Sequence, residues 1–126
     1  MALTQYADHL LIEYLFRTDP VYLALYTQVP TKTSTLGEVT GGSYARELVV
    51  FTAPASGESE NTALITFTTA TADWGAVSHY AIYDAVSGGN MLFYSKFDAE
   101  FARTVESGDI VIVPAGRVTV GALSIL

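Results

Sequence analysis

Short runs of β-forming residues, separated by turn formers, fill the chain from Val21 onward and limit the fold more than any other feature of the sequence. The turn formers include Gly41-Gly42, Gly88-Gly89-Asn90 and Pro114-Ala115-Gly116. Because β-branched and aromatic runs between such turns are typical of antiparallel sheets, about seven or eight strands are expected. The pattern predicts an all-β fold, mainly an antiparallel β-sandwich or a jelly roll over 21–126, with strands at 21–27, 44–52, 63–68, 77–84, 91–97, 110–113 and 117–125.

The segment before these strands has the pattern of an amphipathic helix. Thr4 is placed to cap its first turn, and Asp19-Pro20 ends it, because proline has no N–H to donate and disfavours helical geometry at the residue before it. Apolar residues at steps of three and four are the period of an amphipathic helix. The sequence therefore predicts one N-terminal α-helix over 3–17, with its stripe formed by Leu3, Tyr6, Ala7, Leu10, Leu11, Tyr14 and Leu15.

Two hairpins stand out among the strands. The first joins 80–84 to 91–94, because the intervening Gly88-Gly89-Asn90 tolerates the positive φ that a reversing chain needs. The second turns from 110–113 through Pro114-Ala115-Gly116 into 118–125.

Composition limits the cellular setting and the partners. The chain has 126 residues, 50% of them hydrophobic and 15% charged, with no repeat or low-complexity linker, so a single domain over 1–126 is predicted. The net charge of −7 disfavours nucleic acid and anionic membrane surfaces as partners. There is no cysteine and no cationic leader at the start, which favours folding and assembly in a cytoplasm.

No residue pattern indicates chemistry. His9 and His79 are not spaced as metal ligands, and the patterns of calcium loops, serine hydrolases and phosphate loops are absent. His79 is read as a packed or partner-facing residue in preference to a catalytic base, and Asp84 as an acceptor of backbone hydrogen bonds in the turn after it. Arg46 is read as half of a rim ion pair with Glu47, worth about 0 to 1 kcal/mol. The sequence predicts no catalytic, cofactor or metal site, and so not an enzyme.

Aromatic residues are the feature most open to a functional interpretation. Along 77–83, alternation places Tyr80 and Ile82 on one face and His79 and Tyr83 on the other. Both faces thus carry aromatics, which favours core packing plus a subunit interface over a face that stacks on sugars. The candidate interface residues are Leu3, Tyr6, Leu10, Tyr14, Trp74, His79, Tyr83 and Tyr94.

A series of segments occurs in a characteristic order along the chain: the N-terminal helix, 22–27 (YLALYT), Pro30, 38–46 (EVTGGSYAR), Asn61-Thr62, Phe67, 70–75 (ATADWG), Val77, His79, 82–90 (IYDAVSGGN), Leu92, 107–109 (SGD) and 114–116 (PAG). In this order the segments resemble a family of small proteins of tailed bacteriophages and prophages that are often labelled tail-fibre proteins. The resemblance covers most of the chain. It implies a non-enzymatic virion component and supplies no active site.

The chain has no long repetitive shaft of the kind a true fibre needs. We therefore expect a capsid decoration or cement subunit that stabilises the head, in the form of a homo-oligomer, a trimer. Its partner would be the major capsid protein or another virion protein, contacted through the helix 3–17 or the loop 28–38. The alternative is a tail-fibre or receptor-binding module, in which loop aromatics such as Trp74 and Tyr94 stack on host glycan.

Overall fold

The N-terminal helix forms as predicted, although its last turn is wider than an α-helix. The computed structural model describes residues 3–31, 33–34 and 36–121. Helix α1 spans Gln5–Ile12 and continues as a π-helical turn over Glu13–Arg17. Thr4 caps the first turn, because its Oγ1 accepts a hydrogen bond from the Ala7 N–H at 3.2 Å. The helical segment ends ahead of Asp19-Pro20, as the sequence predicts.

Ten strands lie within the described residues, more than the seven or eight expected. The additional strands β3, β5 and β8 are three residues each, too short to give a readable alternation. The last predicted strand, 117–125, is seen up to Gly121, and its remainder lies outside the described residues. The strands are β1 Val21–Tyr26, β2 Glu47–Val49, β3 Glu58–Glu60, β4 Ile65–Thr66, β5 Gly75–Val77, β6 His79–Tyr83, β7 Met91–Lys96, β8 Arg103–Val105, β9 Ile112–Val113 and β10 Thr119–Gly121.

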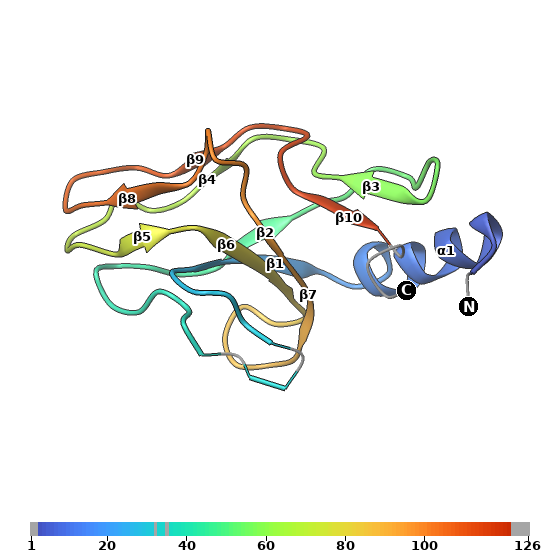
Figure 1. Ribbon diagram of the computed structural model, residues 1–126, viewed down its shortest axis with the longest axis horizontal. Coiled ribbons are helices and arrows are strands. Elements are labelled where there is room, and N and C mark those ends of the chain that lie inside the picture. Colours follow the sequence, from blue (N-terminus) through green and yellow to red (C-terminus); the bar gives the residue numbers. More distant parts are fainter. Residues whose placement is uncertain (1–2, 32, 35, 122–126) are drawn as a thin grey trace.

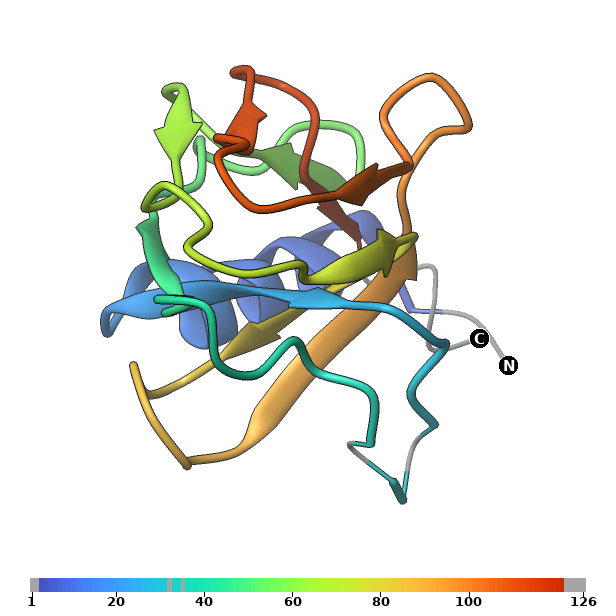
Figure 2. The same cartoon turned by 90° about the vertical axis from the view of Figure 1, so that its left-hand side faces the viewer.

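The strands form two layers, and this confirms the predicted antiparallel all-β class. One layer is a four-stranded sheet in the order β2-β1-β6-β7, with every pair antiparallel. The pairs β3–β10, β4–β9 and β5–β8 lie on one side of it, as Figures 1 and 2 show. The segments 36–46 and 84–90 lie on the other side, and α1 lies at one end of the molecule (Figure 1).

The main core fills the space between the layers. Tyr80 and Ile82 point into it, while Tyr83 points to the opposite face of the sheet and joins a smaller cluster with Ala24, Tyr26 and Ala81, as the alternation predicts. Phe16 docks the helical segment on this core, with its ring 5.5 Å from that of Phe51 and 6.1 Å from that of Phe93.

One of the two predicted hairpins is confirmed and the other is wrong. β6 and β7 pair antiparallel, from His79 with Lys96 to Tyr83 with Met91, with one register shift, a β-bulge, between Ile82 and Tyr83. By contrast, β9 pairs with β4, and β10 pairs with β3, so the chain around Pro114 connects two separate pairs. Asn61 explains the difference: its Nδ2 donates to the Pro114 carbonyl at 3.0 Å, and its Oδ1 accepts from the Val118 N–H at 2.9 Å. These bonds occupy backbone groups that a tight hairpin would use itself.

Candidate functional site

The most elaborate polar arrangement in the described chain centres on Arg46, which is 9% exposed. Its Nε and Nη2 donate to the two carboxylate oxygens of Glu38, each at 2.9 Å. Nη1 donates to the carbonyls of Ala85 at 3.0 Å and Gly88 at 2.7 Å. Such a two-pronged ion pair has a defined geometry and joins the segment 38–46 to the loop after β6.

Three tyrosines complete this group. The guanidinium carbon of Arg46 lies 3.5 Å from the centre of the Tyr83 ring, a cation–π contact, and the Tyr83 hydroxyl is hydrogen-bonded to that of Tyr26. The Tyr44 hydroxyl donates to Glu38 at 2.7 Å and accepts from the Leu25 N–H at 3.0 Å. We call Glu38, Arg46 and these three tyrosines the Arg46 cluster.

Burial and mutual hydrogen bonding set the ionisation of the Arg46 cluster. Burial, and then the charge and hydrogen bond of Glu38, raise the pKa of Tyr44 well above its usual value. Burial and the hydrogen bond to Tyr83 do the same to the pKa of Tyr26. Burial alone would lower the pKa of Arg46, but the hydrogen bond and charge of Glu38, together with Tyr83 and Tyr44, raise that pKa. Around neutral pH Arg46 is therefore a guanidinium cation, and Tyr26 and Tyr44 are neutral.

The expected rim pair of Arg46 with Glu47 is wrong. Glu38, eight positions upstream, takes the guanidinium instead, because the bridge between Tyr26 and Glu38 lays the segment after β1 beside the strand. Sequence reasoning missed the cluster because its members come from β1, β6 and the segment between β1 and β2. The available signal was Glu38, the one acidic residue of the segment 27–46, whose other charged residues are Lys32 and Arg46.

The predicted interface residues of the helix form an exposed row. Leu3 is 36% exposed, Tyr6 75%, Leu10 52% and Tyr14 74%, so the row runs along the side of the helical segment that faces away from the core. Ile12 and Phe16 occupy the opposite side and are buried. The helix therefore has apolar residues on both sides, and only one side is covered within this chain. We call Leu3, Tyr6, Leu10 and Tyr14 the helix face.

Trp74 and Tyr83, two further interface candidates, are buried in the chain itself. Trp74 is 5% exposed, its Nε1 donates to the Gly42 carbonyl at 3.0 Å, and its ring packs edge-on against those of Tyr44 and Phe67. Tyr83 is 3% exposed and belongs to the Arg46 cluster. Neither ring has a free face on which a sugar could stack.

His79 and Tyr94, the remaining candidates, are half-buried. The Nδ1 of His79 is hydrogen-bonded to the Ser78 hydroxyl at 2.8 Å, and burial, then the charge of Lys96, lower the pKa of His79. No carboxylate in the described chain is hydrogen-bonded to this imidazole, so the pair lacks the orienting group of a catalytic triad. Tyr94 packs beside the small cluster around Ala81. The structure thus does not gather the candidates into one site.

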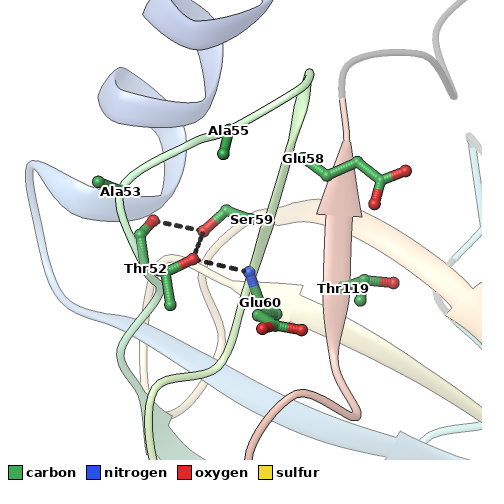
Figure 3. Close-up of a pocket in the computed structure, with 7 residues that line it drawn as sticks. All are labelled: Thr52, Ala53, Ala55, Glu58, Ser59, Glu60 and Thr119. Carbon is green, nitrogen blue, oxygen red and sulfur yellow. Dashed lines mark hydrogen bonds between the residues drawn. The ribbon is translucent and has the colours of Figure 1, made fainter.

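A hollow beside β3 and β10 is lined mainly by hydroxyl and carboxylate groups (Figure 3). The Ser59 hydroxyl donates to the Thr52 carbonyl, and the Thr52 hydroxyl accepts from the Glu60 N–H at 3.2 Å. These bonds hold the two hydroxyls against the neighbouring backbone. The lining residues are Thr52, Ala53, Ala55, Glu58, Ser59, Glu60 and Thr119.

A second hollow lies between the π-helical turn and β2 and is mostly apolar. Two of its residues, Leu48 and Val50, are 56% and 58% exposed, which continues apolar surface beyond the end of the helix. The lining residues are Phe16, Arg17, Thr18, Asp19, Pro20, Leu48, Val49, Val50 and Phe51.

Within the described ranges, no three side chains of the His, Cys, Asp and Glu types are grouped as metal ligands. The helical segments found there are also too short to cross a bilayer.

Comparison with known families gives a match that covers nearly the whole chain. The family model described as Podophage GP4 fiber I protein gp80 matches residues 2–121. A search of curated proteins finds no match.

Proposed function

The chain belongs to the family described as Podophage GP4 fiber I protein gp80, and from this premise we propose that it is a non-enzymatic structural subunit of a phage virion. The phage-fibre family supports the virion role. We further propose that the chain assembles in the host cytoplasm and attaches to a neighbouring virion protein through the helix face.

The observation that carries the mode of attachment is the exposure of the helix face. Two tyrosines and a leucine that are all more than half exposed lie in one row, on a helix whose other side already docks on the core. Apolar rows of this kind, with aromatic residues among them, are what a helix presents to a partner groove. The apolar hollow beside Leu48 and Val50 extends the same type of surface.

The non-enzymatic part of the proposal is supported by how the polar groups are used. Arg46 and Glu38 are bonded to each other, and Asp84 accepts from the Asn90 N–H at 2.7 Å and from its side chain at 3.1 Å, as the sequence predicts for a turn. Each of these groups stabilises a loop, and none of them lines either of the two hollows described above.

Two placements on the particle are compatible with such a subunit. Capsid decoration, with the major capsid protein as partner, is supported by the compact two-layer body, which has no shaft in its described part. A place in a fibre is supported by the family's description. Quantitative mass spectrometry of purified virions separates them: a copy number near that of the major capsid protein supports decoration, and a far smaller number supports a fibre.

The attachment is tested by incorporation into particles. A phage carrying Tyr6→Ser, Leu10→Ser and Tyr14→Ser together is expected to assemble virions that lack the protein. A matched control with Leu64→Ser and Ile112→Ser, at positions 58% and 46% exposed on the β layers, is expected to retain it. Normal incorporation of the folded helix variant would refute attachment through the helix face.

A glycan-binding form of the fibre role is tested separately. Stacking of a sugar on an aromatic ring would now depend on Tyr94, because Trp74 is buried. Saturable binding of the isolated protein to host surface glycans that is lost in Tyr94→Ser would support it.

A further inference from the structure

The outer edge of β7 has no backbone partner within the described residues. β7 pairs with β6 alone and ends the four-stranded sheet, and Figure 2 shows it along the lower rim of the molecule. Its residues Met91–Lys96 include one charged side chain, Lys96, and no proline. Open edges of this length are normally shielded by charges, prolines or covering loops, because they pair readily with other strands.

The register identifies which groups point outward. The Phe97 N–H donates to the Ser78 carbonyl at 3.0 Å, so the pair of residues 78 and 97 is a hydrogen-bonded one. Hydrogen-bonded and non-hydrogen-bonded pairs alternate along an antiparallel ladder. His79–Lys96 and Ala81–Tyr94 are therefore non-hydrogen-bonded pairs, and the N–H and C=O groups of Tyr94 and Lys96 face away from β6.

The other end of the sheet is not open in the same way. The segment that continues β2 pairs with 60–62: the Thr62 N–H donates to the Val50 carbonyl at 2.9 Å, and the Thr52 N–H donates to the Glu60 carbonyl at 2.8 Å. The sheet thus offers one long free edge, and an open head-to-tail chain of sheets would need two.

We propose that β7 pairs with β7 of a second copy of this chain, antiparallel about a two-fold axis at Tyr94. In this register Tyr94 lies opposite its own counterpart, and the outward N–H and C=O groups of the two Tyr94 residues bond to each other. Lys96 comes opposite Leu92 of the other copy, at the β-bulge of β7, and β7 begins beside the turn in which Asp84 accepts hydrogen bonds from Asn90. The cation of each copy thus approaches a carboxylate, whereas parallel pairing would place the two lysines side by side.

This contact differs from the trimer expected from the sequence. A three-fold ring requires two different complementary surfaces on each copy, while a two-fold contact uses one surface twice. It is also independent of the attachment through α1. A protein that enters virions through the helix face but is monomeric in solution would overturn this inference alone.

The test introduces charges of either sign at residue 94, which lies on the proposed two-fold axis. Wild-type protein is expected to sediment as a dimer at equilibrium. Tyr94→Lys and Tyr94→Glu should each sediment as monomers, because like charges then face each other across the axis. Mixing the two variants in equal amounts should restore the dimer. The control Ile112→Lys, at an exposed position on β9, should remain dimeric.

Several results would overturn the inference. These are a wild-type monomer or trimer, a dimer that persists in Tyr94→Lys, or a mixture of the two variants that stays monomeric. If a variant fails to fold, the pairing is tested instead by measuring amide hydrogen exchange of the wild-type protein at several protein concentrations. The Tyr94 and Lys96 amides should become protected as protein concentration rises, and exchange that is independent of concentration contradicts the pairing.

Discussion

The Arg46 cluster and the helix face differ in where their side chains lie: those of the cluster are turned into the chain, and those of the helix face are turned to the outside. At the cluster, a guanidinium is 9% exposed and all of its bonds stay within the chain. Along the helix, Tyr6 and Tyr14 are 75% and 74% exposed and contribute little to the core. Burying a charge is tolerable only where every partner is supplied, while exposing an aromatic ring costs a folded monomer little. The comparison indicates that the cluster maintains the fold and that the helix face is free for assembly.

The largest effect is expected from breaking the ion pair inside the cluster. Arg46→Met leaves the Glu38 carboxylate half-buried without its cation and should lower the free energy of unfolding by about 3–5 kcal/mol, measured by urea denaturation. Arg117→Met is the control, because the pair of Arg117 with Asp98 is largely exposed and is worth about 0–1 kcal/mol. A similar cost for the two variants would mean that the cluster does not maintain the fold.

A smaller loss is expected from Gly42→Ala, which tests the packing beside the cluster. Gly42 has a φ of +58°, and a Cβ there would lie 2.8 Å from Nε1 of Trp74, so the change should cost about 1–3 kcal/mol. Gly41→Ala shares the positive φ, at +73°, but meets nothing within 4 Å and should cost only about 1–2 kcal/mol of backbone strain. Thermal unfolding followed by the fluorescence of the single tryptophan compares them. Equal losses would show that Trp74 can move aside.

Alkaline pH probes the tyrosines of the cluster. The folded-state pKa of Tyr44 is raised by burial and by Glu38, while an unfolded tyrosine ionises near pH 10. The stability linked to this raised pKa is fully present below about pH 10 and is lost as pH rises further, at up to about 1.4 kcal/mol per pH unit. Tyr44→Phe should flatten the decline of the unfolding free energy between about pH 9 and 11. If the unfolding free energy of Tyr44→Phe falls with pH as steeply as that of the wild type, ionisable groups other than Tyr44 cause the decline.

The smallest effect on stability is expected at the helix face. Tyr6→Ser and Tyr14→Ser should each change the free energy of unfolding by about 0.5 kcal/mol or less, because the rings are largely exposed. Ile12→Ala, on the buried side of the same helix, should cost about 2–5 kcal/mol. Losses above 1 kcal/mol at both tyrosines would show that the helix face has a structural role within the monomer.

Local signals in the sequence determined much of the fold. The stop at Asp19-Pro20, the cap at Thr4, the hairpin of β6 and β7 and the acceptor role of Asp84 all depend on residues within a few positions of each other. Turn chemistry and side-chain alternation act over that range, and so they are readable without a structure. Family membership could also be recognised, because it depends on the order of such segments.

Only the tertiary structure decided which of these residues are buried. Arg46 could not be paired correctly from the sequence, because the carbonyls it binds lie 39 and 42 positions away. The burial of Trp74 depends on Gly42, 32 positions upstream, and the separation of β9 from β10 depends on Asn61. The sequence placed Tyr6, Leu10 and Tyr14 in one helical row, but a helix has two sides, and packing against Phe51 and Phe93 determined which side was left exposed.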